Sequence, residues 1–279
     1  MVSAMKNPTL AFIGAGNMAG SLIAGLIADG TDPTRLRVAD PDPEKLRAMT
    51  ARFGVVTLAD NPEAAAGADV VVLAVKPQVL KGVAEALAPM VREHRPLVVS
   101  VAAGIRETDL CRWLGGDAAV VRAMPNTPAL VGSGATALYA NPRVSQTQRS
   151  LAESVLRAVG LTLWLDDEQL MDAVTAVSGS GPAYFFLVME AMQEAARQLG
   201  LPAETARLLT LQTAFGAAKM ALESTEEPGG LRQRVTSPGG TTEKALGVLE
   251  DGALRGLFLK AIEAAATRSR ELADEFGGQ

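Results

Sequence analysis

Short apolar runs alternate with amphipathic segments along the first part of the chain. The runs are rich in Val, Ile and Leu, and the segments between them carry apolar residues at helical spacing. Continuous apolar runs of this length are typical of strands covered on both faces in a parallel sheet. We expect such strands at 9–13, 36–39, 55–57, 69–75, 97–101, 120–123, 135–139 and 161–165. Their alternation with helices predicts a doubly wound α/β domain.

The pattern changes at residue 167. The segments that follow are long, rich in Ala and helical in period, and we expect helices at 168–178, 182–199, 203–223, 241–249 and 255–276. Several of them are apolar on more than one face, which requires more burial than a small domain can offer. The sequence therefore predicts an α/β domain over 1–166 and an all-α dimerisation domain over 167–279, through which two copies intertwine as a homodimer.

A glycine-containing turn follows the first expected strand. Gly14, Gly16 and Ala19 have the G-x-G-x-x-G/A spacing and stand between that strand and a helix expected at 17–28. Gly14 permits a tight turn, Gly16 lets a pyrophosphate approach the backbone, and the amides at the helix start attract phosphate. We therefore interpret the first domain as a dinucleotide-binding Rossmann domain. The alternative is an ordinary tight turn from strand to helix.

Polar residues follow the second and third expected strands. Asp40 lies about twenty residues beyond the glycine turn, where an acid can accept hydrogen bonds from the ribose 2′-hydroxyl of an adenosine. Segment 40–43 is equally well explained as a turn and helix cap, with Pro43 near the first helical position. Further along, Asn61 is expected to cap a helix over 62–66, because asparagine is a preferred N-cap residue.

Composition excludes several classes of function. Hydrophobic residues make up 48% and charged residues 20%, so disorder is not expected. The net charge of −5 comes without a long basic run, which argues against nucleic acid or an anionic membrane as a partner. Apolar runs such as 70–75 are too short to span a bilayer, and residues 1–8 show no secretion signal. We expect a small-molecule substrate.

Cysteine and histidine each occur once. Cys111 cannot form an internal disulfide, which fits a reducing cytoplasm, and a buried structural role is favoured over a reactive thiol. His94 lies in a polar stretch that we place at a surface turn. A single histidine excludes histidine triads and multi-histidine metal sites, and we expect no metal.

Two glycine-containing loops are expected in the helical half. One is Ser178–Gly181, before a long helix, and the other is 236–242, which opens a later helix. Successive amides in such loops, beside hydroxyl groups and at a helix start, suit a carboxylate or phosphate. Flexible turns are the alternative, and the proline and four hydroxyl residues of 236–242 favour an anion site.

Together these segments resemble the pyrroline-5-carboxylate reductase family, which catalyses the last step of proline biosynthesis. The matching segments are FIGAGNMA at 12–19, AVKPQ at 74–78, SVAAG at 100–104, MPNTP at 124–128, VSGSGPAY at 177–184 and TSPGGTT at 236–242. They follow the family's order over nearly the whole chain, and the last two are the most specific.

The resemblance implies reduction of Δ1-pyrroline-5-carboxylate to L-proline by hydride from NADPH or NADH. It also implies an obligate dimer, in some members assembled further into a decamer. A protonated cyclic imine is already electrophilic at carbon, so the protein's main tasks are to position the reactants and to exclude water.

The resemblance also assigns roles to individual residues. It places the cofactor on Gly14, Gly16, Asn17, Met18, Asp40, Asn61, Ala74, Val75, Lys76, Pro77, Ala102, Ala103, Met124, Pro125 and Asn126. It places the substrate on Ser178, Ser237, Gly239, Gly240, Thr241 and Thr242, with the carboxylate on the loop amides. Thr242 is the expected catalytic residue, since its hydroxyl would face the ring nitrogen. The loop at 237–242 could complete the site of the other subunit.

One departure concerns the cofactor. Family members that prefer NADPH usually have small hydroxyl residues or an arginine around the positions of Asp40 and Pro41. A carboxylate there would repel a 2′-phosphate by about 1 kcal/mol or more at close range. We therefore expect NADH to be used better than is usual in the family, without excluding NADPH.

Other functions are weaker candidates. A β-hydroxyacid dehydrogenase also joins a Rossmann domain to a helical domain, but it needs a lysine on the long helix that follows Ser178–Gly181, and 182–199 contains none. A reductase of another cyclic imine is also open, because the carboxylate site is inferred. A non-catalytic NAD(P) sensor would bind the cofactor without turnover, and an effector or DNA-binding segment would be expected beside it.

Overall fold

The computed structural model describes residues 7–278, and the chain divides into two compact units. The first, called the sheet unit, is made of two segments of the chain, one that ends at Ser180 and one that begins at Ala265. The second, called the helical unit, is Gly181–Ala264. The division predicted after residue 166 stays a prediction.

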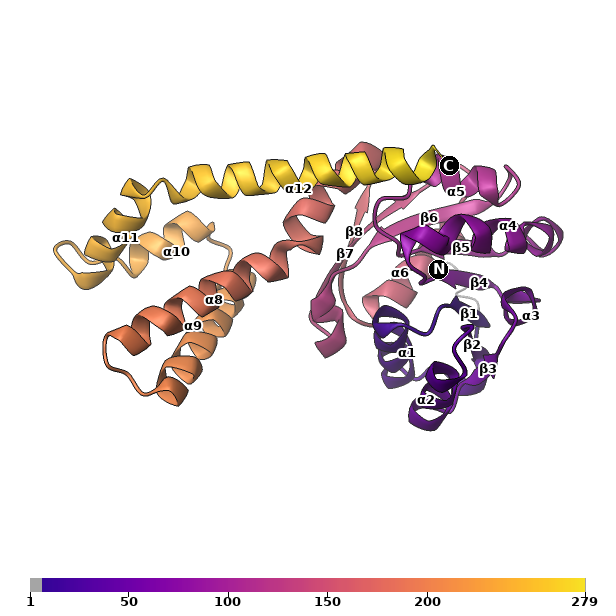
Figure 1. The fold of residues 1–279 in the computed structure, drawn as a ribbon, viewed down its shortest axis with the longest axis horizontal. Helices are drawn as coiled ribbons and strands as arrows, with labels where there is room; N and C mark the ends of the chain where they lie inside the picture. The colour runs from indigo at the N-terminus through magenta and orange to yellow at the C-terminus, as the bar shows by residue number, and fades with distance from the viewer. Residues whose placement is uncertain (1–6, 279) are drawn as a thin grey trace. The chain divides into compact units, whose positions relative to one another are not determined.

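The sheet unit is built on an eight-stranded sheet with the order β3-β2-β1-β4-β5-β6-β7-β8 (Figure 1). The strands are β1 (Leu10–Ile13), β2 (Leu36–Ala39), β3 (Val56–Leu58), β4 (Val70–Leu73), β5 (Leu97–Ser100), β6 (Ala119–Met124), β7 (Gly134–Ala140) and β8 (Gly160–Leu165). Neighbours pair in parallel except β6 and β7, which are antiparallel. The direction of winding reverses between β1 and β4, where open α/β sheets bind ligands. The predicted doubly wound fold is confirmed.

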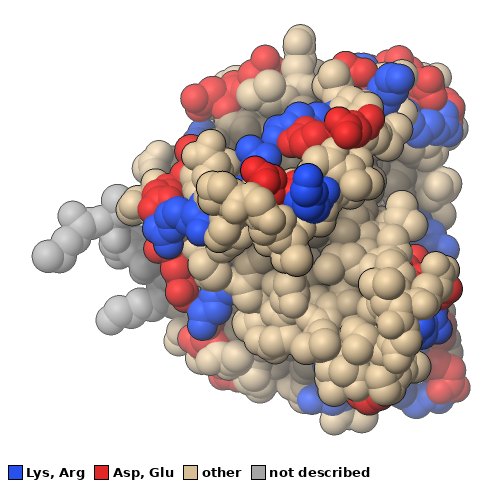
Figure 2. All heavy atoms as spheres, turned by 90° about the vertical axis from the view of Figure 1, so that its left-hand side faces the viewer, with Lys and Arg blue, Asp and Glu red and all other residues tan. Residues whose placement is uncertain are grey.

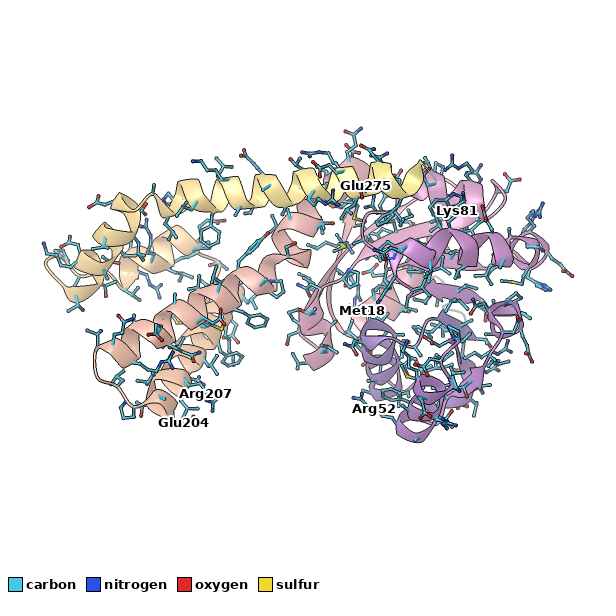
Figure 3. All side chains as sticks on the ribbon, viewed as in Figure 1. Met18, Arg52, Lys81, Glu204, Arg207 and Glu275 are labelled. Carbon is cyan, nitrogen blue, oxygen red and sulfur yellow. The ribbon has the colours of Figure 1, made fainter. Side chains whose placement is uncertain are left out.

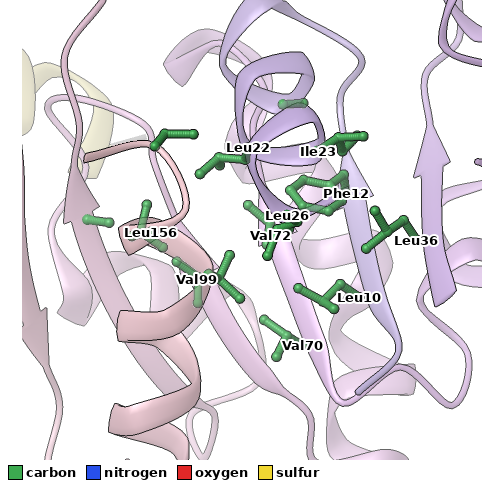
Figure 4. Packing of buried hydrophobic residues seen from close by; sticks show 14 of the residues in the cluster. Leu10, Phe12, Leu22, Ile23, Leu26, Leu36, Val70, Val72, Val99 and Leu156 are labelled. Carbon is green, nitrogen blue, oxygen red and sulfur yellow. The ribbon is translucent and has the colours of Figure 1, made fainter. Parts of the chain in front are cut away.

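Helices cover both faces of this sheet. They are α1 (Asn17–Ala28), α2 (Pro43–Phe53), α3 (Asn61–Ala65), α4 (Pro77–His94), α5 (Glu107–Trp113) and α6 (Gln146–Arg157), with short turns η1 (Pro33–Arg35) and η2 (Thr127–Val131). Alternate residues of β1 enter two separate cores. Leu10 and Phe12 pack with α1 and α6 (Figure 4), whereas Ala11 and Ile13 pack with α3, α4 and α5. The predicted burial of both faces is confirmed.

One local prediction in this unit needs correction, and one helix was not predicted. The cap of α3 is Asp60, whose Oδ1 accepts from the Glu63 amide at 2.8 Å, and Asn61 is the first helical residue instead. Both residues are good N-caps, so the sequence alone did not separate them. Helix α5 was not predicted, because a helix of this length has too few apolar residues to show a helical period.

The link from β8 to the helical unit stays helical. It consists of η3 (Glu168–Leu170), α7 (Met171–Val174) and η4 (Thr175–Gly179), followed by α8 (Gly181–Gln198). The Ser180 amide donates to the Thr175 carbonyl at 2.8 Å, which makes η4 a wide π-helical turn. The open glycine loop predicted at Ser178–Gly181 is therefore wrong, since its backbone continues the helix.

The helical unit consists of α8, α9 (Ala203–Glu223), α10 (Pro228–Arg234), α11 (Thr241–Asp251) and the first part of α12 (Leu254–Gly277). Helix α8 packs against α9. An ion pair between Glu204 and Arg207 lies near the start of α9 (Figure 3). Helix α10 was missed because its glycines and arginines hide any apolar period. Within residues 7–278, no helix has the length and hydropathy needed to cross a membrane.

Many large apolar side chains of the helical unit are exposed in the single chain. They include Phe185, Phe186, Leu187, Leu208, Leu209, Phe215, Leu222, Val248, Leu257 and Leu259. Figure 2 faces the side on which Figure 1 draws these helices, and a broad part of that surface is free of charged residues. An exposed apolar surface of this extent is typical of a protein interface.

Candidate active site

The glycine turn packs tightly against the neighbouring strands. Gly14 has φ +104°, and a Cβ there would lie 2.6 Å from the carbonyl oxygen of Ala74. Its amide donates to the Ala39 carbonyl at 2.7 Å. The position therefore accepts only glycine, and it fixes the turn to the ends of β2 and β4.

The start of α1 is open and has no side-chain cap. Gly16 is the N-cap residue, and a Cβ there would meet nothing within 4 Å. Asn17 is exposed and Met18 is half-buried on the first turn (Figure 3). Free amides and the positive end of the helix dipole attract an anion. These residues fit the pyrophosphate of a dinucleotide.

Asp40 is buried at the end of β2 and bonds to the protein itself. Its Oδ2 accepts from the Ala15 amide at 2.9 Å, and its Oδ1 accepts from the Asp42 amide at 2.9 Å. Lys45 Nζ lies 3.5 Å from Oδ1. Asp42 caps α2, which begins at Pro43. The turn-and-cap interpretation of this segment is confirmed, whereas binding of a ribose by Asp40 stays a prediction.

The ends of β4 and β5 lie beside the glycine turn in the sheet. Ala74 and Val75 are half-buried after β4, and the exposed Lys76 is the N-cap of α4. After β5, Ala102 is buried and Ala103 is half-buried. Ala74, Ala102 and Ala103 thus place small side chains at the carboxyl edge of the sheet.

Two of the sequence motifs meet within the sheet unit. The Asn126 side chain donates to the Ser178 carbonyl and to the Ser178 hydroxyl, each at 3.2 Å, and accepts from the Ala135 amide at 2.9 Å. Gly179 contacts Met124, since a Cβ at Gly179 would overlap the Met124 Cε. The segment after β6 is thus fastened to the π-helical turn.

A buried polar network lies next to these motifs and was not foreseen. Arg122, only 5% exposed, pairs with Glu168 Oε1 at 2.9 Å, and the same oxygen accepts from the Glu107 amide at 2.7 Å. The Asn141 amide group donates to Glu107 Oε1 at 2.6 Å. Burial, and then the charge of Glu168, raises the pKa of Tyr139. The one signal in the sequence was a charged residue inside an otherwise apolar strand.

In the helical unit, the loop 236–242 forms a tight turn before α11. The Gly240 amide donates to the Ser237 carbonyl at 3.0 Å, and Gly239 has φ +72°. Gly240 is the N-cap of α11 without a side-chain cap. The Gly239 amide donates to Glu243 Oε2 at 2.7 Å, so the loop already holds one carboxylate of its own helix. Thr242 Oγ1 makes no hydrogen bond to another described residue.

Comparison with known proteins agrees with this arrangement. Residues 168–272 match the family described as pyrroline-5-carboxylate reductase dimerisation, and residues 9–104 match the family described as NADP oxidoreductase, coenzyme F420-dependent. Two solved structures are similar over nearly the whole chain. A pyrroline-5-carboxylate reductase from Coxiella burnetii has a TM-score of 0.92 at 52% identity and covers 96% of this chain and 99% of its own. The Plasmodium falciparum pyrroline carboxylate reductase with NADP bound has a TM-score of 0.85 at 30% identity, with the same coverages.

Curated relatives are similar over their full length. The pyrroline-5-carboxylate reductase of Pseudomonas aeruginosa is 54% identical over 273 residues, which are 98% of this chain and 100% of the relative. The reductase of Haemophilus influenzae is 43% identical over 96% of this chain and 98% of the relative. With this identity across both units, the chain belongs to the pyrroline-5-carboxylate reductase family.

Proposed function

We propose that this chain reduces Δ1-pyrroline-5-carboxylate to L-proline with hydride from NADPH or NADH, the last step of proline biosynthesis. The observation that carries the proposal is 54% identity to a pyrroline-5-carboxylate reductase along the whole chain. The uncapped start of α1 and the close packing of Gly14 support it, because they suit a dinucleotide.

The cofactor is held by the carboxyl edge of the sheet unit in this proposal. The turn at Gly14, Gly16, Asn17 and Met18 takes the pyrophosphate, and Asn61 lies toward the adenosine. The segments 74–77 and 102–103 follow the nicotinamide ribose, and Met124, Pro125 and Asn126 line the nicotinamide. Asn126 does this while its amide group bonds Ser178 and Ala135, so its part is chiefly to hold the loop in place.

The substrate carboxylate is received by the loop of the helical unit. The amides of Thr241 and Thr242 lie at an uncapped helix start, which supports the binding of an anion. The Thr242 hydroxyl orients the ring nitrogen. When bound, the nicotinamide supplies a hydride that adds to the imine carbon, and the protonated nitrogen becomes the amine of proline.

Assembly and location complete the proposal. The chain carries the family's dimerisation domain, and we assign a homodimer that covers the exposed apolar surface of the helical unit. Assembly into a decamer and the cytoplasm as the site of action are parts of the proposal that rest on the sequence. The domain boundary at residue 166 is a further part, supported by the family match from residue 168.

The decisive experiment is oxidation of NADPH and of NADH, separately, with Δ1-pyrroline-5-carboxylate. Substrate-dependent loss of nicotinamide absorbance, with proline as the product, is the expected result. Cofactor binding without turnover would reject the proposed reaction, and other cyclic imines would then be tested.

A further experiment asks which subunit supplies the loop at 237–242. Gly14→Val and Thr242→Ala chains are prepared separately and mixed under conditions that exchange subunits. After exchange, about half of the dimers contain one chain of each variant. If the loop serves the partner's cofactor, each of these mixed dimers has one intact site out of two, so about a quarter of the wild-type activity returns. No recovery would assign the loop to its own chain.

A further inference from the structure

The carboxylate of Asp40 is buried and hydrogen-bonded to the protein backbone through both of its oxygens. Its side chain is only 8% exposed, and each oxygen accepts a backbone amide at 2.9 Å, from Ala15 and from Asp42. A carboxylate that binds a ribose must present a free lone pair to the ribose hydroxyls. Here the carboxylate ties the glycine turn to the end of β2.

Lys45 supplies the counter-charge and stays accessible. Its Nζ lies 3.5 Å from Asp40 Oδ1, while its side chain is 51% exposed. It stands on the first turn of α2 and lines a hollow of about 440 Å³ that also includes Gly16 and Asn17. The ammonium group therefore shares a surface with the start of α1, where the pyrophosphate is placed.

The other acids at this edge also have partners. Asp42 Oδ1 accepts from the Glu44 amide at 2.9 Å and so caps α2. The Glu44 carboxylate pairs with Arg47. The repulsion expected from the sequence assumed a free carboxylate at position 40, whereas the structure presents a carboxylate that is buried, hydrogen-bonded and paired with a lysine.

We propose that Lys45 is the specificity-determining residue for the cofactor, binding the 2′-phosphate of NADPH, and that Asp40 is a positioning residue for the glycine turn. NADPH is then preferred over NADH, which reverses the expectation from the sequence. The inference rests on the proposed function only in taking a nicotinamide dinucleotide as the ligand of this edge.

Calorimetric titration with NADP⁺ and with NAD⁺ tests this inference without any turnover. Wild-type protein binds NADP⁺ more tightly than NAD⁺. Lys45→Ala weakens NADP⁺ by about tenfold, as expected for one partly exposed charge-assisted contact, and leaves NAD⁺ within about twofold. Arg47→Ala, which removes a positive charge from the same helix outside the hollow, is the matched control and keeps both affinities.

Asp40→Asn separates the two roles. The asparagine keeps the shape but loses the charge and one acceptor, so both cofactors weaken by a similar factor as the glycine turn loosens. If Asp40 bound the ribose, NAD⁺ would weaken selectively and NADP⁺ would gain. Selective weakening of NAD⁺ in Asp40→Asn would overturn the inference. So would tighter binding of NAD⁺ than of NADP⁺ by the wild type, or equal losses of affinity for both cofactors in Lys45→Ala. If Lys45 sets NADP⁺ binding but pyrroline-5-carboxylate is not reduced, the inference stands and the proposed reaction fails.

Discussion

The side-chain amide of Asn126 donates to both the carbonyl and the hydroxyl oxygen of Ser178, each at 3.2 Å. Its own oxygen accepts from the Ala135 amide at 2.9 Å, so all of its polar atoms are used. The residue joins the segment after β6 to the π-helical turn before α8. A small shift in this joint would move the segment that we place against the nicotinamide.

Substitution of Asn126 by Asp should lower kcat by about tenfold or more. Aspartate still accepts from Ala135 but cannot donate to Ser178, and it puts a negative charge beside the Ser178 carbonyl. Ser178→Ala, which removes only one acceptor, should cost a few-fold. Steady-state kinetics, together with the thermal midpoint, distinguishes lost positioning from lost folding.

A matched control lies in the same turn. The Ser180 hydroxyl makes no hydrogen bond to another described residue, so Ser180→Ala should keep kcat within about twofold. If Ser180→Ala and Ser178→Ala behaved alike, the bond from Asn126 would have no special part in positioning.

Thr242→Ala should lower kcat, whereas Thr242→Ser should retain most of it. The proposed role needs a hydroxyl that orients the ring nitrogen, and serine keeps that group. Loss of one hydrogen bond to a charged group corresponds to about 1.5–3 kcal/mol, or roughly one to two orders of magnitude in rate. Turnover with the imine at saturating cofactor is the measurement, and an unchanged kcat in the alanine variant would remove Thr242 from the mechanism.

Glu243→Gln should lower the KM for the imine substrate. The Glu243 carboxylate accepts from the Gly239 amide at 2.7 Å, next to the amides proposed to take the substrate carboxylate. Removing its charge relieves repulsion between the two carboxylates, by a few-fold at this exposed position. The change should shrink at high salt. A rise in KM would instead mean that Glu243 holds the loop in its binding shape.

Sequence patterns defined the fold because its central strands β1, β4 and β5 are buried on both faces. Continuous apolar runs marked β1, β4 and β5 within a residue or two, and Pro43 marked the start of α2. Short elements such as α5 and α10 escaped because a turn or two of helix gives no clear period.

The site was harder to predict because its contacts join distant segments. Gly14 and Gly16 were identified from local spacing, which directly encodes a tight turn. The bond from Asn126 to Ser178 spans 52 residues, and that from the Ala15 amide to Asp40 spans 25. Neither is visible in a local pattern. Such contacts decide whether an acid binds a ligand or its own backbone. Asp40 is an example, because its carboxylate accepts hydrogen bonds from two backbone amides.

Glu168→Ala should destabilise the protein strongly through Arg122. The Arg122 side chain is 6% exposed and would lose its carboxylate partner at 2.9 Å, leaving a buried charge unpaired. Such a loss costs about 3–5 kcal/mol of unfolding free energy. The double variant Arg122→Met, Glu168→Ala removes the unpaired charge and should recover part of the loss. Denaturant unfolding measures both. Glu275→Ala, which removes one of the two exposed partners of Arg268, should change the unfolding free energy by less than about 1 kcal/mol. A comparable effect at both sites would contradict the role assigned to burial.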